Sequence, residues 1–272
     1  EKIGAEVVPG GVLDTQARIL KIQELQCTAM MATPTYVLGM ADTAKTKMGI
    51  DPRSLAIRKI TCAGEPGASI PTTKKRMQDA WGAKVYDHAG ATEIGAWCFE
   101  CEAQSGGLHV NEPFFLVEIQ DTETGESIEE PGRRGKMIIT ALDRQAQPCV
   151  RFDSKDIIEW APEPCPCGRT SRLIKGGVVG RADDITKVKG VLLAPSAIEE
   201  VVRGLDGLAD EFEVIVDKEG DIDRITLKVE ILKGREGERK RIEGQLKDQL
   251  RLKTNLGYNL EFHDHGTLPR YD

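Results

Sequence analysis

A charged, glycine-bounded segment constrains the fold of this chain more than any other feature of its sequence. Residues 180–190 (GRADDITKVKG) carry five charged side chains within nine residues and begin and end in glycine. This strip is typical of a hinge between two domains, because glycine permits the backbone rotations that reorient two parts of a chain; the alternative is an ordinary surface hairpin. On the hinge interpretation we expect a large domain over residues 1–180, a hinge with a first hairpin over 181–190, and a small mobile domain over 185–272.

Composition narrows the class of protein. Hydrophobic residues make up 40% and charged residues 30% of the chain, which is typical of a soluble globular protein. A net charge of −7 disfavours a general nucleic-acid or anionic-membrane binder, and every apolar run is far shorter than a membrane span. Seven cysteines, an odd number without a disulfide framework, indicate a reducing cytoplasm.

Strand and helix patterns alternate along the first third of the chain and predict a parallel sheet with crossover helices. The predicted helices cover residues 15–24, 36–48 and 70–81, and the predicted strands cover 27–31, 55–63 and 84–86. Strands then dominate (114–120, 136–142, 149–152 and 157–160), which predicts a β subdomain. Beyond the hinge, helices over 195–202 and 235–252 and strands over 211–217, 224–232 and 260–262 predict a small α+β unit. The predicted fold class is therefore α/β, with a small α+β C-terminal domain.

Polar motifs follow several of the predicted strands, where ligands bind in open α/β sheets. Thr92 and Glu93 place a hydroxyl beside a carboxylate, which can serve a phosphate oxygen and Mg²⁺; the alternative is a helix N-terminus capped by Thr92. A tight turn is predicted at Gly64–Pro66. Asp156 follows another strand and precedes Arg181 by 25 residues.

The order and spacing of these motifs resemble the adenylate-forming acyl-CoA synthetases, most closely the phenylacetate–CoA ligase branch. The resemblance implies that an aromatic or arylacetic carboxylate reacts with ATP to an acyl-adenylate and passes to coenzyme A, with Mg²⁺ as a cofactor. Transfer to a carrier-protein thiol is one alternative. A non-catalytic, zinc-stabilised nucleotide-binding or scaffold protein is another. Relatives often pair, so the resemblance also points to a homodimer.

The resemblance assigns roles to individual residues. It implies catalytic roles for Thr92 at the α-phosphate, Glu93 at the magnesium ion, and Lys187. The nucleotide-binding residues that it implies are Gly64, Glu65, Pro66, Tyr86, Asp87, Thr92, Asp156 and Arg181. It makes Asp183 the hinge pivot and places Lys189 and Gly190 on the face that meets coenzyme A. Tyr36 matches the acyl pocket, with a core aromatic as the equal alternative. The sequence departs from the family at Ala89, where relatives carry an aromatic residue.

The cysteines give an independent signal. Cys165 and Cys167 form a Cys-Pro-Cys-Gly turn, and Cys101 precedes His109 by eight residues. Four nitrogen and sulfur ligands are what a structural zinc site needs. We expect zinc on Cys101, His109, Cys165 and Cys167. The alternatives are a set in which Cys98 replaces His109, or free thiols without a metal.

The resemblance also indicates segments outside the sequence. Relatives begin with a Ser/Thr/Gly-rich phosphate-binding loop, and residues 3–9 match a segment downstream of it. Relatives end with a glycine-lysine segment whose lysine stabilises the adenylation transition state, and the sequence stops just short of it. We therefore expect a fragment or a split subunit. Because each missing charge-stabilising group is worth roughly 10²–10³ in rate, we expect these 272 residues alone to be inactive.

Overall fold

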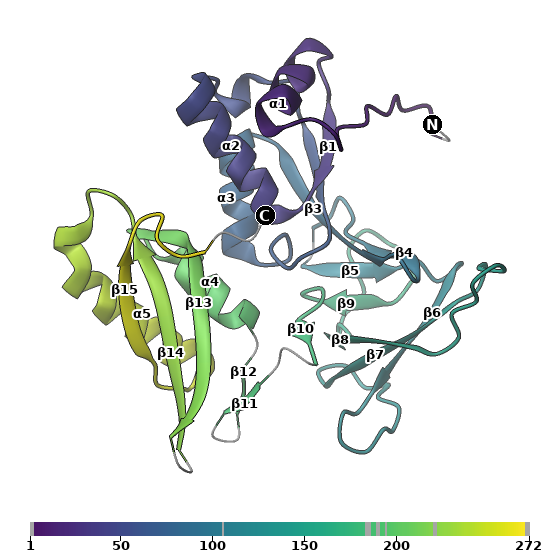
Figure 1. Ribbon diagram of the computed structural model, residues 1–272. Helices are drawn as coiled ribbons and strands as arrows, with labels where there is room; N and C mark the ends of the chain where they lie inside the picture. The colour runs from purple at the N-terminus through teal and green to yellow at the C-terminus, as the bar shows by residue number, and fades with distance from the viewer. Residues whose placement is uncertain are drawn as a thin grey trace.

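The computed structural model describes residues 3–104, 106–182, 186–188, 191–193, 195–219 and 222–269, with backbone alone at 186–188, 191–192, 218–219 and 222–223. It has an α/β fold whose helices and strands Figure 1 shows. The described residues form three apolar clusters, one in each of the parts described below. Among the described residues, no helix combines the length and the apolar character that crossing a membrane requires.

The N-terminal layer is a parallel sheet covered by helices on one face. Strands β1 (Ala29–Ala32), β2 (Lys59–Cys62) and β3 (Lys84–Ala91) pair in parallel. Between them run α1 (Thr15–Glu24), α2 (Pro34–Met48), the short η1 (Pro52–Ser54) and α3 (Pro71–Trp81). Ile19, Val37, Ile60, Met77, Trp81 and Val85 are among the side chains of its apolar core. The helices over 15–24 and 70–81 begin and end where the sequence predicts them, within a residue.

Local signals explain these helices. Asp14 caps α1 by accepting a hydrogen bond from the backbone N–H of Ala17 at 2.8 Å. Proline occupies the first helical position of both α2 and α3, where its missing N–H costs nothing. Gly49 and Gly82 end these two helices in the left-handed conformation that favours glycine.

The sheet continues beyond β3 with antiparallel strands. These are β4 (Gly95–Phe99), β5 (Gly107–Val110) and β9 (Leu173–Lys175), in the order β1-β2-β3-β4-β5-β9. The strand predicted over residues 84–86 is longer in the structure and turns back into β4 as a hairpin. Thr92 and Glu93 therefore lie in a strand-to-strand turn, and the alternative of a helix N-terminus is wrong.

A second, four-stranded antiparallel sheet forms the predicted β subdomain. Its strands are β6 (Phe115–Gln120), β7 (Arg134–Ala141), β8 (Phe152–Glu159) and β10 (Gly180–Arg181), in the order β10-β8-β7-β6. One apolar cluster lies between the two sheets and includes Trp97, Ile119, Met137, Ile139, Ile158 and Trp160.

The C-terminal part has its own core. A hairpin of β11 (Thr186–Val188) and β12 (Val191–Leu193) precedes α4 (Pro195–Gly204). Next come β13 (Leu208–Glu219), β14 (Ile222–Ile231), η2 (Glu236–Glu238), α5 (Arg239–Thr254) and β15 (Asn259–Asp264). Ile198, Val202, Leu227, Ile242, Leu246 and Leu250 are among its buried side chains. The predicted limits of the large domain (1–180), the hinge (181–190) and the small domain (185–272) stay predictions.

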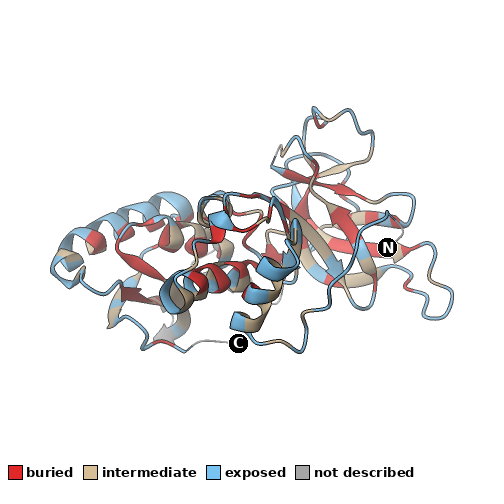
Figure 2. Cartoon of the chain, turned by 90° about the horizontal axis from the view of Figure 1, so that it is seen from above, coloured by how far each residue is buried: buried red, intermediate tan, exposed pale blue. Residues whose placement is uncertain are grey.

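Helices α3 and α4 join the two parts of the chain. The Arg76 guanidinium forms a two-pronged ion pair with Asp210 of β13, with Nη2 and Oδ2 2.8 Å apart. Glu199 of α4 is 9% exposed and lies 3.5 Å from the hydroxyl of the buried Thr73. Figure 2 shows buried residues in both parts of the chain. Polar contacts therefore help to hold this arrangement.

Candidate functional site

The turn at Gly64–Pro66 is fixed against the start of α2. The Glu65 carboxylate accepts hydrogen bonds from the backbone N–H and the hydroxyl of Thr35, at 2.6 and 2.5 Å. Gly67 has φ +148°, and a Cβ there would lie 2.6 Å from the Pro34 side chain. Glycine is therefore required for this close approach. The Glu65 side chain therefore satisfies a backbone N–H in the first turn of α2.

Thr92 and Glu93 occupy the β3–β4 turn, with both side chains exposed. Their backbone carbonyls are held by the β7–β8 connection: Arg144 donates to the carbonyl of Thr92 at 3.1 Å, and the Cys149 thiol donates to that of Glu93 at 3.0 Å. The backbone of the turn is therefore anchored, while its hydroxyl and carboxylate face solvent. This is what a phosphate and metal site needs before its ligands arrive.

Asp156 and Arg181 lie side by side on paired strands. They are register partners in the antiparallel pair β8–β10. Arg181 donates to the backbone carbonyl of Ser154 at 3.3 Å, and the Asp156 N–H donates to the Ser154 hydroxyl at 3.1 Å. The two residues are 25 apart in the sequence, and the sheet brings a carboxylate and a guanidinium together. The residues predicted to bind ribose and phosphate therefore lie together at the β8–β10 edge of the second sheet.

Asp87 lines a cavity of about 310 Å³ on the α3 face of the sheet. Ser69 and Gly177 also line it, and they come from the segments that follow the Gly64–Pro66 turn and precede Arg181. Gly177 has φ +73°, and a Cβ there would lie 3.2 Å from a carboxylate oxygen of Asp87. Burial raises the pKa of Asp87 to about 6, against hydrogen bonds from Ser69 and the backbone of His88 that lower it. The segment after the Gly64–Pro66 turn and the segment before Arg181 therefore both meet Asp87 at this cavity.

The remaining predicted residues lie away from this cavity or outside the described side chains. Tyr86 points to the opposite face of the sheet, with Lys59 Nζ 5.8 Å from its ring centre. The Tyr36 hydroxyl is 3.1 Å from that of Thr15 on α1. Asp183, Lys189 and Gly190 lie outside the described residues, and the side chain of Lys187 on β11 does as well.

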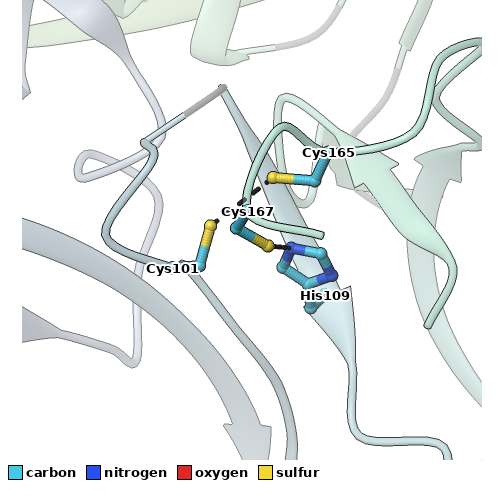
Figure 3. A group of neighbouring side chains, drawn as sticks. All are labelled: Cys101, His109, Cys165 and Cys167. Carbon is cyan, nitrogen blue, oxygen red and sulfur yellow. Dashed lines mark hydrogen bonds between the residues drawn. The ribbon is translucent and has the colours of Figure 1, made fainter. Parts of the chain in front are cut away.

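The structure brings four metal-binding side chains together, as Figure 3 shows. Cys101 follows β4, His109 lies on β5, and Cys165 and Cys167 lie in the β8–β9 connection. Their ligand atoms all lie within 4.8 Å of one another. The Cys101 and Cys165 sulfurs are 3.5 Å apart, and Cys167 Sγ is 3.3 Å from His109 Nε2. These separations are close to the ~3.7 Å edge of a tetrahedron with ~2.3 Å zinc–sulfur bonds.

The surroundings of the group also suit a metal. His109 is fully buried, and its Nδ1 lies 3.2 Å from the Ser171 hydroxyl, which leaves Nε2 directed at the three sulfurs. Hydrogen bonds from the backbone and then the side chain of Arg169 lower the pKa of Cys167 to about 6, whereas burial raises that of Cys101. Cys98, the alternative ligand, is 1% exposed and packs in the apolar core between the sheets.

Residues that the sequence did not single out complete the cavity beside Asp87. Lys74 and Glu100 form an ion pair that is almost buried, with side-chain exposures of 16% and 4%. Ser69 lies two residues beyond the predicted turn, and Gly177 belongs to a glycine pair that precedes the hinge. That glycine pair was the one visible signal, because adjacent glycines indicate a close backbone approach. No sequence pattern indicated that Lys74 and Glu100 would lie beside Asp87.

Comparisons with known proteins agree with this geometry. Residues 190–272 match the AMP-binding enzyme C-terminal domain family. The chain is 31% identical to a phenylacetate–coenzyme A ligase of Aromatoleum evansii over 97% of its own length and 59% of that protein. It is 30% identical to one of Thermus thermophilus, over 85% of its own length and 51% of that protein. The chain thus spans little more than half the length of these curated relatives.

The fold is that of a solved acyl-CoA ligase. A 2-hydroxyisobutyryl-CoA ligase in the postadenylation state, in complex with 2-HIB-AMP, matches with a TM-score of 0.87 and 25% identity, over 95% of this chain and 55% of that one. Sequence and structure together define an adenylate-forming enzyme fold. Within that superfamily, the chain belongs to the branch of the phenylacetate–CoA ligases.

The same ligase in complex with 2-HIB-AMP and CoA in its thioesterification state matches with a TM-score of 0.60, at 24% identity over 98% of this chain and 56% of that one.

Proposed function

We propose that the whole protein activates an aromatic or arylacetic carboxylate with ATP and transfers the acyl group from the adenylate to coenzyme A. The pairing of Asp156 with Arg181, together with a cavity that Asp87 and Gly177 line, supports this most directly. Asp156 and Arg181 lie on paired strands, and Asp87 lines the cavity beside the segment leading to Arg181. In this proposal Asp87, Asp156 and Arg181 contact the adenine, the ribose and the phosphate, in that order along the nucleotide.

Each of these side chains has a chemical task in the proposal. The Asp87 carboxylate accepts a hydrogen bond from the amino group of adenine. Asp156 accepts hydrogen bonds from the ribose hydroxyls, and Arg181 binds ribose or phosphate as a permanent cation. Because Asp156 and Arg181 are register partners, one rigid strand pair fixes both and removes the cost of ordering them when the nucleotide binds.

In the proposal, the exposed β3–β4 turn binds the phosphate. The Thr92 hydroxyl donates to the α-phosphate as the substrate carboxylate attacks phosphorus. Glu93 would hold Mg²⁺, which would offset phosphate charge when bound. The acyl-adenylate forms as pyrophosphate leaves, and the thiol of CoA then displaces AMP. In the proposal, Asp183 is the pivot between these steps, and Lys187, Lys189 and Gly190 lie on the face that turns toward the adenylate. The Tyr36 side chain is the proposed contact for the acyl group.

The four-residue group of Cys101, His109, Cys165 and Cys167 is the proposed site of a structural zinc ion. Its four donors fill a tetrahedron, so a substrate has no open position at the metal. The ion would tie the β4–β5 edge of the first sheet to the connection between the two sheets. We propose that the protein works in the cytoplasm, where the seven free thiols stay reduced, and that it forms a homodimer.

Product analysis with the whole protein tests the proposed activity. With ATP, Mg²⁺, phenylacetate and CoA, the proposal expects AMP and phenylacetyl-CoA in equal amounts. Offering a carrier protein in place of CoA separates the two acceptors. Formation of AMP only with the carrier would reassign the acceptor, and absence of AMP with a panel of aromatic and aliphatic acids would remove the proposal. In that case a non-catalytic nucleotide-binding protein would be the better description.

A further inference from the structure

An ion pair lies directly behind Asp87. Glu100, one residue beyond β4, accepts two contacts from Lys74 Nζ of α3, at 2.5 and 2.6 Å. Glu100 Oε2 also accepts the backbone N–H of Asp87 at 2.9 Å, and the backbone N–H of Glu100 donates to the carbonyl of Asp87 at 2.9 Å. The Glu100 side chain is only 4% exposed. One carboxylate therefore ties α3, β3 and β4 together at the residue that lines the cavity.

A buried ion pair is a costly feature. Removing two charges from water costs several kcal/mol per ion, and an apolar pair of similar volume is often as stable. A stabilising role alone is therefore a poor explanation for Lys74 and Glu100. What the pair does provide is geometry, because it fixes the backbone of Asp87 on both its N–H and its carbonyl side through Glu100. The direction of the Asp87 carboxylate depends on that backbone.

We infer that Lys74 and Glu100 are positioning residues for base recognition: they hold Asp87 so that its carboxylate selects a nucleotide base with an exocyclic amino group. This inference rests on the proposed nucleotide site. A carboxylate accepts from the 6-amino group of adenine and repels the 6-carbonyl oxygen of hypoxanthine. AMP should therefore bind more tightly than IMP by about tenfold to a hundredfold, the range that one charge-assisted hydrogen bond supplies.

The test compares the affinities of AMP and IMP by calorimetry in matched variants. Lys74→Met removes the partner of Glu100, and Glu100→Gln removes the charge while keeping an oxygen for the Asp87 N–H. Lys74→Arg keeps the cation. Lys84→Met is the control, because Lys84 lies on β3 itself but pairs with Glu102 on the solvent-exposed face, where its side chain is 58% exposed.

We expect Lys74→Met and Glu100→Gln to lower the preference for AMP over IMP by about tenfold, while Lys74→Arg and Lys84→Met keep it. A merely structural role would weaken both nucleotides alike and leave their ratio unchanged. The inference is overturned if the folded variants retain the wild-type ratio, or if the wild-type protein binds AMP and IMP equally. If Lys74→Met does not fold, Glu100→Gln decides alone. A wild-type protein that binds neither nucleotide would instead remove the proposed nucleotide site.

Discussion

The contact between α3 and β13 offers a sharp test of how the two parts of the chain are held. Arg76 and Asp210 form a two-pronged ion pair with side-chain exposures of 38% and 34%. Because both groups are about one-third exposed, the pair is worth only about 0.2–1 kcal/mol. Its loss should shift the balance between two arrangements by about 1.4-fold to 5-fold, since 1.4 kcal/mol corresponds to a factor of ten. The change is small but lies within reach of single-molecule methods.

Charge reversal gives the perturbation. Arg76→Asp and Asp210→Arg each place like charges opposite each other, and the double variant restores an ion pair of opposite direction. Fluorophores introduced through unnatural amino acids at Leu20 on α1 and Leu252 on α5, which are 53% and 87% exposed, report the separation of the two parts by energy transfer. Each single variant should lower the population of the arrangement described above. The double variant should recover most of it.

Two outcomes would refute this reasoning. If the single variants leave the energy-transfer distribution unchanged, the ion pair does not contribute to the arrangement. If they change it but the double variant does not recover it, the effect comes from packing around α3 rather than from the charge pair. The contact of Thr73 with Glu199 lies in the same interface and stays intact in all variants, so it provides the constant background.

Three further predictions follow from single side chains. The pKa of Asp87 is about 6 in the folded protein against an ordinary 3.8, so the folded state binds the proton more tightly. The free energy of unfolding should therefore fall as pH rises from about 4 to about 6, by about 2 kcal/mol more in the wild type than in Asp87→Asn, as urea titrations at several pH values can measure. Elemental analysis should find about one zinc per chain, and Cys165→Ala should abolish it and lower the melting temperature; a metal-free wild-type protein from zinc-replete medium contradicts the site. Gly177→Ala adds a Cβ 3.0 Å from the Ser69 side chain at φ +73°, so it should cost about 1–2 kcal/mol of stability and weaken AMP binding, and unchanged affinity would remove Gly177 from the site.

Local sequence signals predicted those helices whose limits are set by nearby residues. Helix α3 has proline at its first position and glycine after its last, and its predicted limits of 70–81 differ from the observed Pro71–Trp81 by one residue. The predicted α/β class is confirmed, but the parallel part of the sheet is limited to β1, β2 and β3. Antiparallel β4 extends this sheet, because the chain reverses at Thr92 and Glu93 and β4 pairs with β3. The residues of the turn alone do not reveal that pairing.

The resemblance to the family pointed to single residues of the candidate site, whose roles stay predictions. It selected Asp156 and Arg181, and the sheet makes them register partners. Cys101 and His109 were selected over Cys98, whose strand position faces the core. The support behind Asp87 was not predictable, because Lys74, Glu100 and Gly177 come from three separate segments and meet only in the folded chain. Long-range packing of this kind leaves no local pattern in a sequence.

The most direct measurement is the effect of AMP on the unfolding free energy of the chain. A ligand that binds only the native state stabilises it, by about 2.7 kcal/mol when its concentration is a hundred times its dissociation constant. If Asp156 and Arg181 hold a nucleotide, AMP should raise the denaturant midpoint of the wild type and should raise that of Asp156→Ala much less at the same concentration. Equal midpoints with and without AMP, in the wild type up to millimolar AMP, would contradict the account.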